Sequence, residues 1–470
     1  MATTEELVDG FAPVDLYQRR EKIITRHVGG RFQKLRFYTG WPLLIGYFCT
    51  PWMMWDDRQA VLFDLPARQF HIFALNIWPQ DLWMLGWLLM IAAFGLFTVT
   101  NIVGRLWCGY TCPQTVWTAV FMWIEQKTEG SRHQRIRLDQ APLSWDKFRK
   151  RTSKHVLWLG FAFLTGFTFV SYFTPIRPLV FDLATFDLAA ISGWAIFWIA
   201  FFTLATYANA GWLREQVCTY MCPYARFQSA MIDRDTLIVS YKPTRGEPRG
   251  ARKRGTDTIA LKDLGDCVDC QLCVQVCPTG IDIREGLQYQ CIGCAHCIDA
   301  CDQIMDKMGS EKGLIGYTTL NALNGGTVNW LRPRSIGYAA VCLVIVSSFA
   351  IALFNRAPMD IDILRDRGVL YAERSDGAID NDYQLKVMNK SHHQATYNLK
   401  VLEPSWVTVR SQDELAVPAG AIVNVPLTLT SSPGATQAAN TKVMLELCSP
   451  DSCVREETRF LAPSNTQRTS

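Results

Sequence analysis

Five long apolar stretches constrain the fold of this 470-residue chain more than any other feature. Each is free of Lys, Arg, Asp and Glu and is about as long as a bilayer-crossing helix, which needs roughly 20 residues. Hydrophobic residues make up 49% of the chain and charged residues 19%, a balance typical of a membrane protein and not of a soluble enzyme. The sequence therefore predicts five transmembrane helices, at residues 37–55, 82–103, 155–175, 188–207 and 336–354.

The positive charges alternate along the chain. All 47 Lys and Arg lie outside the apolar stretches: seven precede the first, and the four connecting segments hold two, ten, one and fifteen. Because cytoplasmic loops carry an excess of Lys and Arg, this pattern predicts three cytoplasmic segments, namely the N-terminus, 104–154 and 208–335. The tail 355–470 holds twelve, but a domain of this size is translocated largely regardless of charge, so we expect it outside. The first 36 residues are polar and do not resemble a cleavable signal.

Eight of the 16 cysteines form two runs, CVDCQLCVQVCP and CIGCAHCIDAC. Both have the C-x2-C-x2-C-x3-C spacing of bacterial two-cluster ferredoxins, in which the fourth cysteine of each run binds the other cluster. The spacing assigns one 4Fe–4S cluster, cluster 1, to Cys267, Cys270, Cys273 and Cys301. It assigns the second, cluster 2, to Cys291, Cys294, Cys297 and Cys277.

Two features qualify this interpretation. Zinc also binds four thiolates, although a doubled eight-thiol register fits zinc poorly. Asp302 follows Cys301 where the ferredoxin pattern has Pro, a change that removes no ligand. The segment 242–255 before the runs is basic and rich in Gly and Pro, so we expect a flexible linker there. Two neighbouring clusters indicate one-electron transfer and not substrate turnover by the clusters themselves.

A second cysteine motif, C-x-Y-x-C-P, occurs as WCGYTCP after the second apolar stretch and as VCTYMCP after the fourth. A four-residue step predicts that the two thiols of each motif lie on one helical face, and Pro113 and Pro223 fit a turn or a first helical turn. Soft thiolates favour Cu(I), and also zinc or iron–sulfur iron. We therefore expect a metal or redox site; buried packing cysteines and a disulfide relay are the alternatives. The four residues are Cys108, Cys112, Cys218 and Cys222.

After the last apolar stretch, short runs alternate apolar and polar residues and are separated by turn sequences such as SSPGATQ. This pattern predicts a small antiparallel β-sandwich of immunoglobulin-like size. Cys448 and Cys453 flank a predicted hairpin turn. A disulfide between them is expected in an oxidising exterior, with free thiols or a metal site as the alternative.

Along essentially its whole length this arrangement resembles the family of cytochrome oxidase accessory proteins called CcoG, FixG or RdxA. The residues that carry the resemblance are WCGYTCP, CTYMCPYARFQ, the double ferredoxin run and the β-rich tail. The resemblance implies a bacterial inner-membrane protein that reduces Cu(II) to Cu(I) for assembly of the cbb-type oxidase. It implies two 4Fe–4S clusters on the eight cysteines and copper handling by the four motif cysteines.

The expected partners are membrane lipid, a cytoplasmic electron donor, and a copper chaperone or oxidase assembly factors, with a homodimer as a further alternative and no nucleic acid. Two other functions stay open: a NapH-like ferredoxin that carries electrons between quinol and a partner, and an assembly scaffold without turnover. The predicted domains are a cytoplasmic segment at 1–36, a four-span domain at 37–240, the linker and ferredoxin module at 241–335, the fifth span at 336–354 and the periplasmic β-domain at 355–470.

Overall fold

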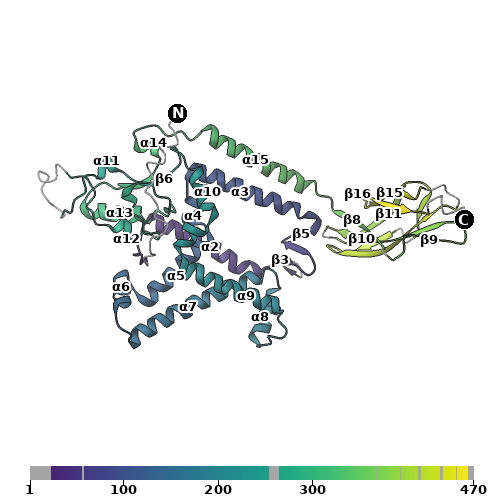
Figure 1. Ribbon diagram of the computed structural model, residues 1–470, viewed down its shortest axis with the longest axis horizontal. Helices are drawn as coiled ribbons and strands as arrows, with labels where there is room; N and C mark the ends of the chain where they lie inside the picture. Colours follow the sequence, from purple (N-terminus) through teal and green to yellow (C-terminus); the bar gives the residue numbers. More distant parts are fainter. Residues whose placement is uncertain are drawn as a thin grey trace. The chain divides into compact units, whose positions relative to one another are not determined.

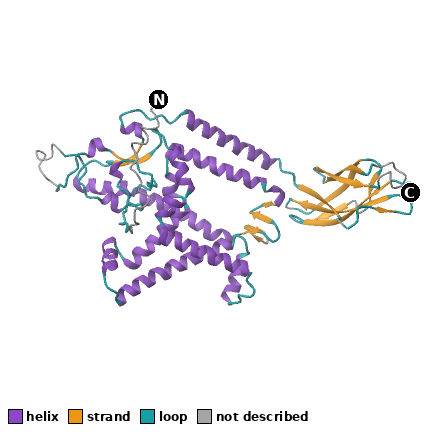
Figure 2. Ribbon diagram, in the orientation of Figure 1, coloured by secondary structure: helices purple, strands orange, loops and turns teal. Residues whose placement is uncertain are grey.

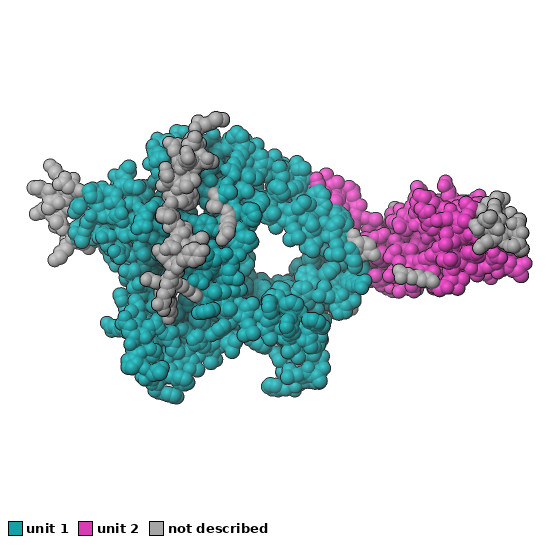
Figure 3. Space-filling model, in the orientation of Figure 1, with its two compact units in different colours: residues 1–73, 77–347 teal, residues 74–76, 348–470 magenta. Residues whose placement is uncertain are grey.

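The computed structural model describes residues 23–55, 58–252, 264–366, 368–391, 393–410, 414–433, 438–450 and 452–463. The chain divides into two compact units, residues 1–73 with 77–347 and residues 74–76 with 348–470 (Figure 3). Helices dominate the first unit and strands the second (Figure 2). The ferredoxin module predicted at 241–335 and the apolar helices that precede it therefore belong to one unit.

Four helices in the described part of the chain are long and apolar enough to cross a membrane: Trp83–Val103, Trp145–Val170, Gly193–Leu213 and Pro333–Phe354. They correspond to the last four predicted spans, so the chain is a membrane protein. The helix expected at 155–175 begins ten residues earlier, because Ser144 caps its N-terminus by accepting a hydrogen bond from the Lys147 N–H. The third helix combines α9 (Gly193–Thr206) with a π-helical segment, Tyr207–Leu213.

The first predicted span, 37–55, is only partly helical. Helix α2 (Arg31–Cys49) carries basic residues in its first turns and ends at Cys49. Residues 50–55 form a 3-10 turn (Thr50–Trp52) and the short strand β1 (Met54–Trp55), so a helix through residue 55 is wrong. Pro51 lies at the start of this 3-10 turn, a position that proline favours because its N–H would have no partner there. A fifth membrane span stays a prediction.

The other helices of the first unit connect these elements (Figure 1). Two of the spans are α3 (Trp83–Val103) and α7 (Trp145–Val170). The connecting helices are α4 (Leu106–Tyr110), α5 (Pro113–Glu129), α6 (Arg132–Gln140), α8 (Ile176–Ala184), the π turn Val217–Met221 and α10 (Pro223–Met231). Short strands are β2 (Arg58–Gln59), β3 (Val61–Asp64), β4 (Gln69–Ile72) and β5 (Leu75–Ile77), and a 3-10 turn spans Pro79–Asp81. Helix α15 (Pro333–Phe354) is the last span.

A buried ion-pair cluster joins α5 to the π-helical segment that leads to the second thiol motif. Glu125 lies 3.0 Å from Arg135 and 3.1 Å from Arg214, and its side chain is almost fully buried. Beside it, the indole N–H of Trp158 donates to the Phe121 carbonyl at 3.0 Å. Because a buried charge without a partner is strongly unfavourable, this cluster fixes Arg214, four residues before Cys218.

The ferredoxin module is built on one strand pair. Strand β6 (Ile238–Tyr241) pairs antiparallel with β7 (Ile315–Thr318), and the module's helical pieces lie between and after them. These pieces are α11 (Pro243–Gly246), α12 (Leu272–Gln275), the 3-10 turn Ile283–Glu285, α13 (His296–Met308) and α14 (Leu320–Leu323).

Residues 242–252 of the expected linker make side-chain contacts with the ferredoxin module. The side chain of Arg245 bonds Asp266 at 2.5 Å and the Lys312 carbonyl at 2.9 Å, and Arg252 donates to the Gly265 carbonyl at 2.7 Å. Its arginines therefore hold the segment against the module. Residues 253–255 lie outside the described residues.

The second unit contains the predicted β-sandwich. One sheet has the order β12-β14-β10-β8, with β9 added to β10, and the other has the order β13-β11-β15-β16. Alternate residues of β10, such as Tyr383, Leu385 and Val387, are buried in the core, as the alternating sequence predicts. The strands are β8 (Met359–Arg365), β9 (Ala372–Glu373), β10 (Ile379–Asn389), β11 (Ala395–Glu403), β12 (Val407–Val409), β13 (Glu414–Val417), β14 (Ile422–Ser431), β15 (Asn440–Cys448) and β16 (Cys453–Leu461).

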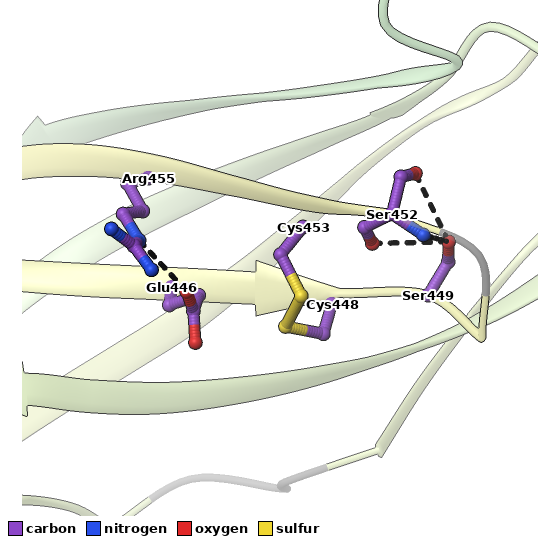
Figure 4. The surroundings of a disulfide bond; sticks show 6 residues. All are labelled: Glu446, Cys448, Ser449, Ser452, Cys453 and Arg455. Carbon is purple, nitrogen blue, oxygen red and sulfur yellow. Dashed lines mark hydrogen bonds and ion pairs between the residues drawn. A yellow bond between two sulfur atoms is a disulfide. The ribbon is translucent and has the colours of Figure 1, made fainter.

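A disulfide closes the last hairpin. Cys448 and Cys453 are direct partners in the β15–β16 register, and their sulfurs are bonded at 2.03 Å (Figure 4). Ser449 and Ser452 bond across the turn, and Arg455 pairs with Glu446 at 2.8 Å. The predicted disulfide is confirmed, and since both sulfurs are used by the bond, the alternative metal site is disfavoured.

Candidate metal centres

The cysteines predicted for cluster 1 line one cavity, which we call cradle 1. Its wall contains Tyr241, Met305 and Leu314. Cys267 and Cys273 are buried, whereas Cys270 is exposed. The four thiols that meet in this cavity are those grouped by the spacing: Cys267, Cys270, Cys273 and Cys301.

The cysteines predicted for cluster 2 line a neighbouring cavity, cradle 2. Apolar residues Val239, Ile281 and Ile292 form much of its wall, and Cys273 of the first run also borders it. The fourth cysteine of the first run crosses over to this cavity, as the fourth of the second run crosses to cradle 1. The thiols predicted for cluster 2 that meet here are Cys277, Cys291, Cys294 and Cys297.

Both runs have the same backbone turns around the second cysteine. The preceding residues, Asp269 and Gly293, have φ of 47° and 67°, and the following residues, Gln271 and Ala295, have φ of 53° and 61°. Positive φ is uncommon for residues other than glycine, so its recurrence at matching positions indicates a shared constraint. The turns bring cysteines that are close in sequence to the rim of one cavity, which fits a cluster held by several thiolates.

The cradle sulfurs are spaced more widely than the ligands of one bound zinc ion. Zinc binds thiolates at about 2.3 Å, which brings its ligands close to one another. In the described part of the chain, no three cradle thiols lie within 4.8 Å of one another; the one group that does is Glu446 with the disulfide cysteines. Thiols spread around a cavity suit a cluster, in which each thiolate binds a different iron atom.

Burial raises the pKa of several cradle thiols above the usual value of a thiol. Burial raises the pKa of Cys273 to about 11, and the positive charge of Arg284 opposes this shift. Burial also raises the pKa of Cys291 and Cys301 to about 12. Because iron binds thiolates, loading the clusters must displace protons from these sulfurs.

Asp302, the departure from the ferredoxin pattern, lies inside α13. The helix continues past Cys301 to Met308, and the Asp302 carboxylate accepts a hydrogen bond from the Gly313 N–H at 3.0 Å. Proline at this position would interrupt the helix, so aspartate extends it without changing a thiol.

Cradle 2 is attached to the N-terminal helix. The Asp299 carboxylate, two residues after the cradle 2 cysteine Cys297, accepts hydrogen bonds from the N–H groups of Phe32 and Gln33 at 3.1 and 2.8 Å. It thereby supplies the N-terminal cap that α2 lacks in its own sequence. His296 lies 2.7 Å from the Gln33 side-chain oxygen and also bonds Arg36.

The two C-x-Y-x-C-P motifs have matching local structures, but not the predicted one. Cys108 lies in α4 and Cys218 in the π turn, whereas Cys112 and Cys222 are N-cap residues with ψ of 129° and 111°. A common helical face is therefore wrong. The following proline disfavours helical geometry at the preceding residue, so each pair spans a break between two helices. The prolines occupy the first helical turn, as predicted.

The four motif thiols are half-buried, and Cys218 is close enough to the other three to interact electrostatically with them. Burial raises the pKa of Cys218 to about 12, and interactions with Cys112, Cys108 and Cys222 raise it further. Burial raises the pKa of Cys108 to about 11, and its sulfur lies 3.6 Å from the Gln228 side-chain oxygen. We call this group the four-thiol site. No three of its sulfurs lie within 4.8 Å, so a metal ion would have to draw them together.

Two polar residues beside the thiols were not singled out from the sequence. Gln228 is fully buried, and Arg105 lies three residues before Cys108. A charged residue directly after an apolar span was the available signal for Arg105, but its main partners lie more than a hundred positions away in the sequence.

Family comparisons agree with this architecture. The family described as "4Fe-4S dicluster domain" matches residues 213–320, and the family described as "4Fe-4S binding domain" matches residues 85–130. The tail, residues 349–463, matches a family described as the "IG-like fold at C-terminal of FixG", in a description that places FixG among the oxidoreductases. The fold and cradles thus define an iron–sulfur oxidoreductase with membrane helices and an immunoglobulin-like domain.

Full-length relatives identify the family. The chain is 41% identical to "Nitrogen fixation protein FixG" of Rhizobium meliloti over 432 residues, covering 84% of this chain and 82% of the relative. It is 39% identical to "Protein RdxB" of Cereibacter sphaeroides over 400 residues, covering 82% and 83%. The crystal structure of a FixG-related protein from Vibrio parahaemolyticus matches 23% of this chain and 97% of its own at 29% identity, with a TM-score of 0.21. The chain belongs to the FixG/RdxA family.

Proposed function

We propose that this protein is a membrane-bound cupric reductase, which reduces Cu(II) to Cu(I) for assembly of a cbb-type cytochrome c oxidase. One observation carries the proposal: the two thiol motifs, over a hundred residues apart in sequence, gather four thiols next to an iron–sulfur cradle. Gly109, between Cys108 and Cys112, approaches the cradle 2 loop so closely that an added Cβ would lie 2.8 Å from the Gly293 carbonyl oxygen.

The chemistry of the thiols suits copper as a substrate. Each Cu(II) takes up one electron to become Cu(I), and soft thiolates bind the product more favourably than hard oxygen ligands do. Burial raises the pKa of Cys108 and Cys218, so copper must displace protons from these two thiols. Cys112 and Cys222 lie at helix N-termini, where backbone N–H groups and the helix dipole stabilise a thiolate.

The eight cradle cysteines would hold two 4Fe–4S clusters, which supply single electrons when bound. Exposed Cys270 makes cradle 1 the side open to a cytoplasmic electron donor. We propose that the module faces the cytoplasm, that the β-domain faces the periplasm, and that Cu(I) passes to a chaperone or to oxidase assembly factors. We also propose that the protein contacts membrane lipid and forms a homodimer. We propose no nucleic-acid partner.

A second candidate function has its own support. The match to a "4Fe-4S binding domain" over residues 85–130 includes Cys108 and Cys112, which favours iron at the four-thiol site. The protein would then be a NapH-like carrier of electrons between quinol and a partner. An assembly scaffold without turnover is the third reading, and it predicts that oxidase assembly survives Cys270→Ser.

These functions are separated by one set of variants. Protein reduced with dithionite and desalted without oxygen is mixed with Cu(II) or with an oxidised quinone, and cluster absorbance and Cu(I) are followed. We expect copper to reoxidise the wild type and the control Cys342→Ser, whose thiol lies in α15, but to act much more slowly on Cys108→Ser and Cys218→Ser. Quinone-dependent reoxidation of all forms, with no effect of copper, would contradict the proposal. Loss of one cluster's iron in Cys108→Ser would favour the second candidate.

A further inference from the structure

Arg105 makes contacts on both sides of the boundary between the four-thiol site and cradle 2. Its Nη1 atom donates to the carbonyl oxygens of Tyr289 at 2.5 Å and Cys291 at 3.2 Å, both in the cradle 2 loop. Its Nη2 atom donates to the Ala225 carbonyl at 3.0 Å, three residues after Cys222. The guanidinium also lies 5.1 Å from the centre of the Tyr289 ring. One side chain therefore joins the first thiol motif, the second motif and the cradle.

Two glycines allow this contact to be close. A Cβ on Gly109 would lie 2.8 Å from the Gly293 carbonyl oxygen and 3.0 Å from the Cys294 Cα. Gly293 has φ of 67° and lies against the Arg105 backbone, where its own Cβ would be 3.2 Å from the Arg105 carbonyl oxygen. Backbone thus meets backbone between the two sites, with no side chain between them.

Two tyrosines brace the same contact. The Tyr317 hydroxyl donates to the Gly293 carbonyl at 2.7 Å and lies 3.1 Å from the Tyr110 hydroxyl. Tyr110 belongs to the first thiol motif and Tyr317 to strand β7. None of the described residues that line cradle 1 forms a hydrogen bond with either thiol motif.

The positive charge of Arg105 lies at both sites. The guanidinium bonds the carbonyl of the cradle 2 residue Cys291 at 3.2 Å and the carbonyl of Ala225, beside the second thiol motif, at 3.0 Å. A fixed positive charge favours the more negative state of whatever redox group lies beside it. This residue therefore stabilises added electrons at cradle 2 and negative charge at the four-thiol site.

We infer that Arg105 is a positioning residue that joins cradle 2 to the four-thiol site and places one shared positive charge between them, so that cradle 2 and not cradle 1 is the redox partner of the thiols. The contacts of Arg105 stand independently of copper, whereas the rate measurement below rests on the proposed function.

The charge is tested with Arg105→Gln and with the matched control Arg334→Gln, whose arginine is exposed and bonds the Ala230 carbonyl at 2.9 Å. Midpoint potentials of the full-length, cluster-loaded protein are measured by electron paramagnetic resonance. Signals are assigned with Cys270→Ser, which removes a ligand of cluster 1 only. We expect Arg105→Gln to lower the potential of cluster 2, or to lose that cluster alone, while cluster 1 and both clusters of the control keep their potentials. An unchanged cluster 2, or equal effects on both clusters, would overturn the inference.

The position is tested separately from the charge. Arg105→Lys keeps the charge but cannot form the three-carbonyl fork, so we expect it to keep the cluster 2 potential while copper-dependent reoxidation slows. Gly109→Ala is expected to slow the same reaction by about tenfold or more at full iron content, because small displacements have large effects on rates in organised sites. The control is Gly160→Ala, where a Cβ would meet nothing within 4 Å.

The two kinds of failure are distinguishable. If wild-type clusters stay reduced in the presence of Cu(II), the copper function fails, and the potentials of Arg105→Gln still decide the inference. If the wild type reacts with copper and both Arg105→Lys and Gly109→Ala react at its rate, the copper function stands and the positioning role of Arg105 is overturned.

Discussion

The two cysteine runs have the same spacing and the same backbone turns, yet their surroundings differ. Cradle 1 has an exposed cysteine, Cys270, and its nearby charges pair within the module, as Arg284 does with Asp282. Cradle 2 contacts α2 through Asp299 and the first thiol motif through Gly109 and Gly293. A repeated motif can therefore serve two roles, because the residues between the ligands determine which elements the cradle contacts.

The largest expected effect comes from restoring the ferredoxin pattern in the second run. Asp302→Pro would place proline inside α13 and should destabilise the protein by about 3 kcal/mol or more, by removing a helical hydrogen bond and clashing with the preceding turn. The thermal midpoint in detergent and the iron content would both fall. Pro278→Ala is the control in the first run, where α12 has already ended at Gln275, and should have little effect. Equal midpoints for the two variants would contradict this role of α13.

Removal of the Asp299 cap on α2 should have the next largest effect on stability. Asp299→Ala removes a buried carboxylate from two backbone N–H groups, which should cost about 2 kcal/mol. Asp269→Ala, in the first run, removes an exposed carboxylate from Arg284, which keeps its second partner Asp282, and should cost less than about 1 kcal/mol. Limited proteolysis near Arg31 and thermal melting measure both. If Asp269→Ala proves the more harmful, our account of the α2 cap is wrong.

Removal of iron should distinguish the two cradles. A chelator added with mild oxidant reaches exposed Cys270 before the buried Cys294, so we expect the signal of cluster 1 to disappear several-fold faster than that of cluster 2. Electron paramagnetic resonance at successive times measures both. Simultaneous loss would mean that the two cradles open together, and the contrast in exposure would then have no consequence.

The smallest effect concerns the tyrosine brace. Tyr317→Phe removes the hydroxyl that bonds the Gly293 carbonyl, and should cost about 1 kcal/mol while leaving the ring in place. We expect a small fall in the thermal midpoint and faster loss of cluster 2 to chelator, with cluster 1 unaffected. Tyr338→Phe, on α15, is the control for loss of a tyrosine hydroxyl. If Tyr317→Phe instead loses cluster 1 faster, the tyrosine contact stabilises cradle 1, and our assignment to cradle 2 is wrong.

Local patterns predicted much of the architecture. Apolar stretches gave four helices that can span a membrane, and alternation in the tail gave the sandwich and its Cys448–Cys453 hairpin. Ligand spacing grouped the cradle thiols as the structure does, because crossover of the fourth cysteine is a property of short loops. Such features depend on residues near each other in the sequence.

The failures have three physical causes. Apolar composition does not show where a helix ends. The apolar run continues to Trp55, so the end of the helix before Pro51 was not predicted. The four-residue spacing predicted both thiols of a motif on one helical face. The prolines after Cys112 and Cys222 disfavour helical geometry at these cysteines, so no single helix carries both thiols. Arg105 was missed for a different reason: its role depends on carbonyl groups up to 186 positions away, which a single sequence does not bring together.

Proteins that hold one cluster at a time show most directly whether cluster 2 or cluster 1 passes electrons to copper. Cys270→Ser protein, which keeps the ligands of cluster 2, and Cys294→Ser protein, which keeps those of cluster 1, are reduced, desalted and mixed with Cu(II) without oxygen. We predict that copper reoxidises the first and yields Cu(I), whereas the second stays reduced over the same time. Fast reoxidation of the Cys294→Ser protein, with the Cys270→Ser protein unreactive, would contradict the account.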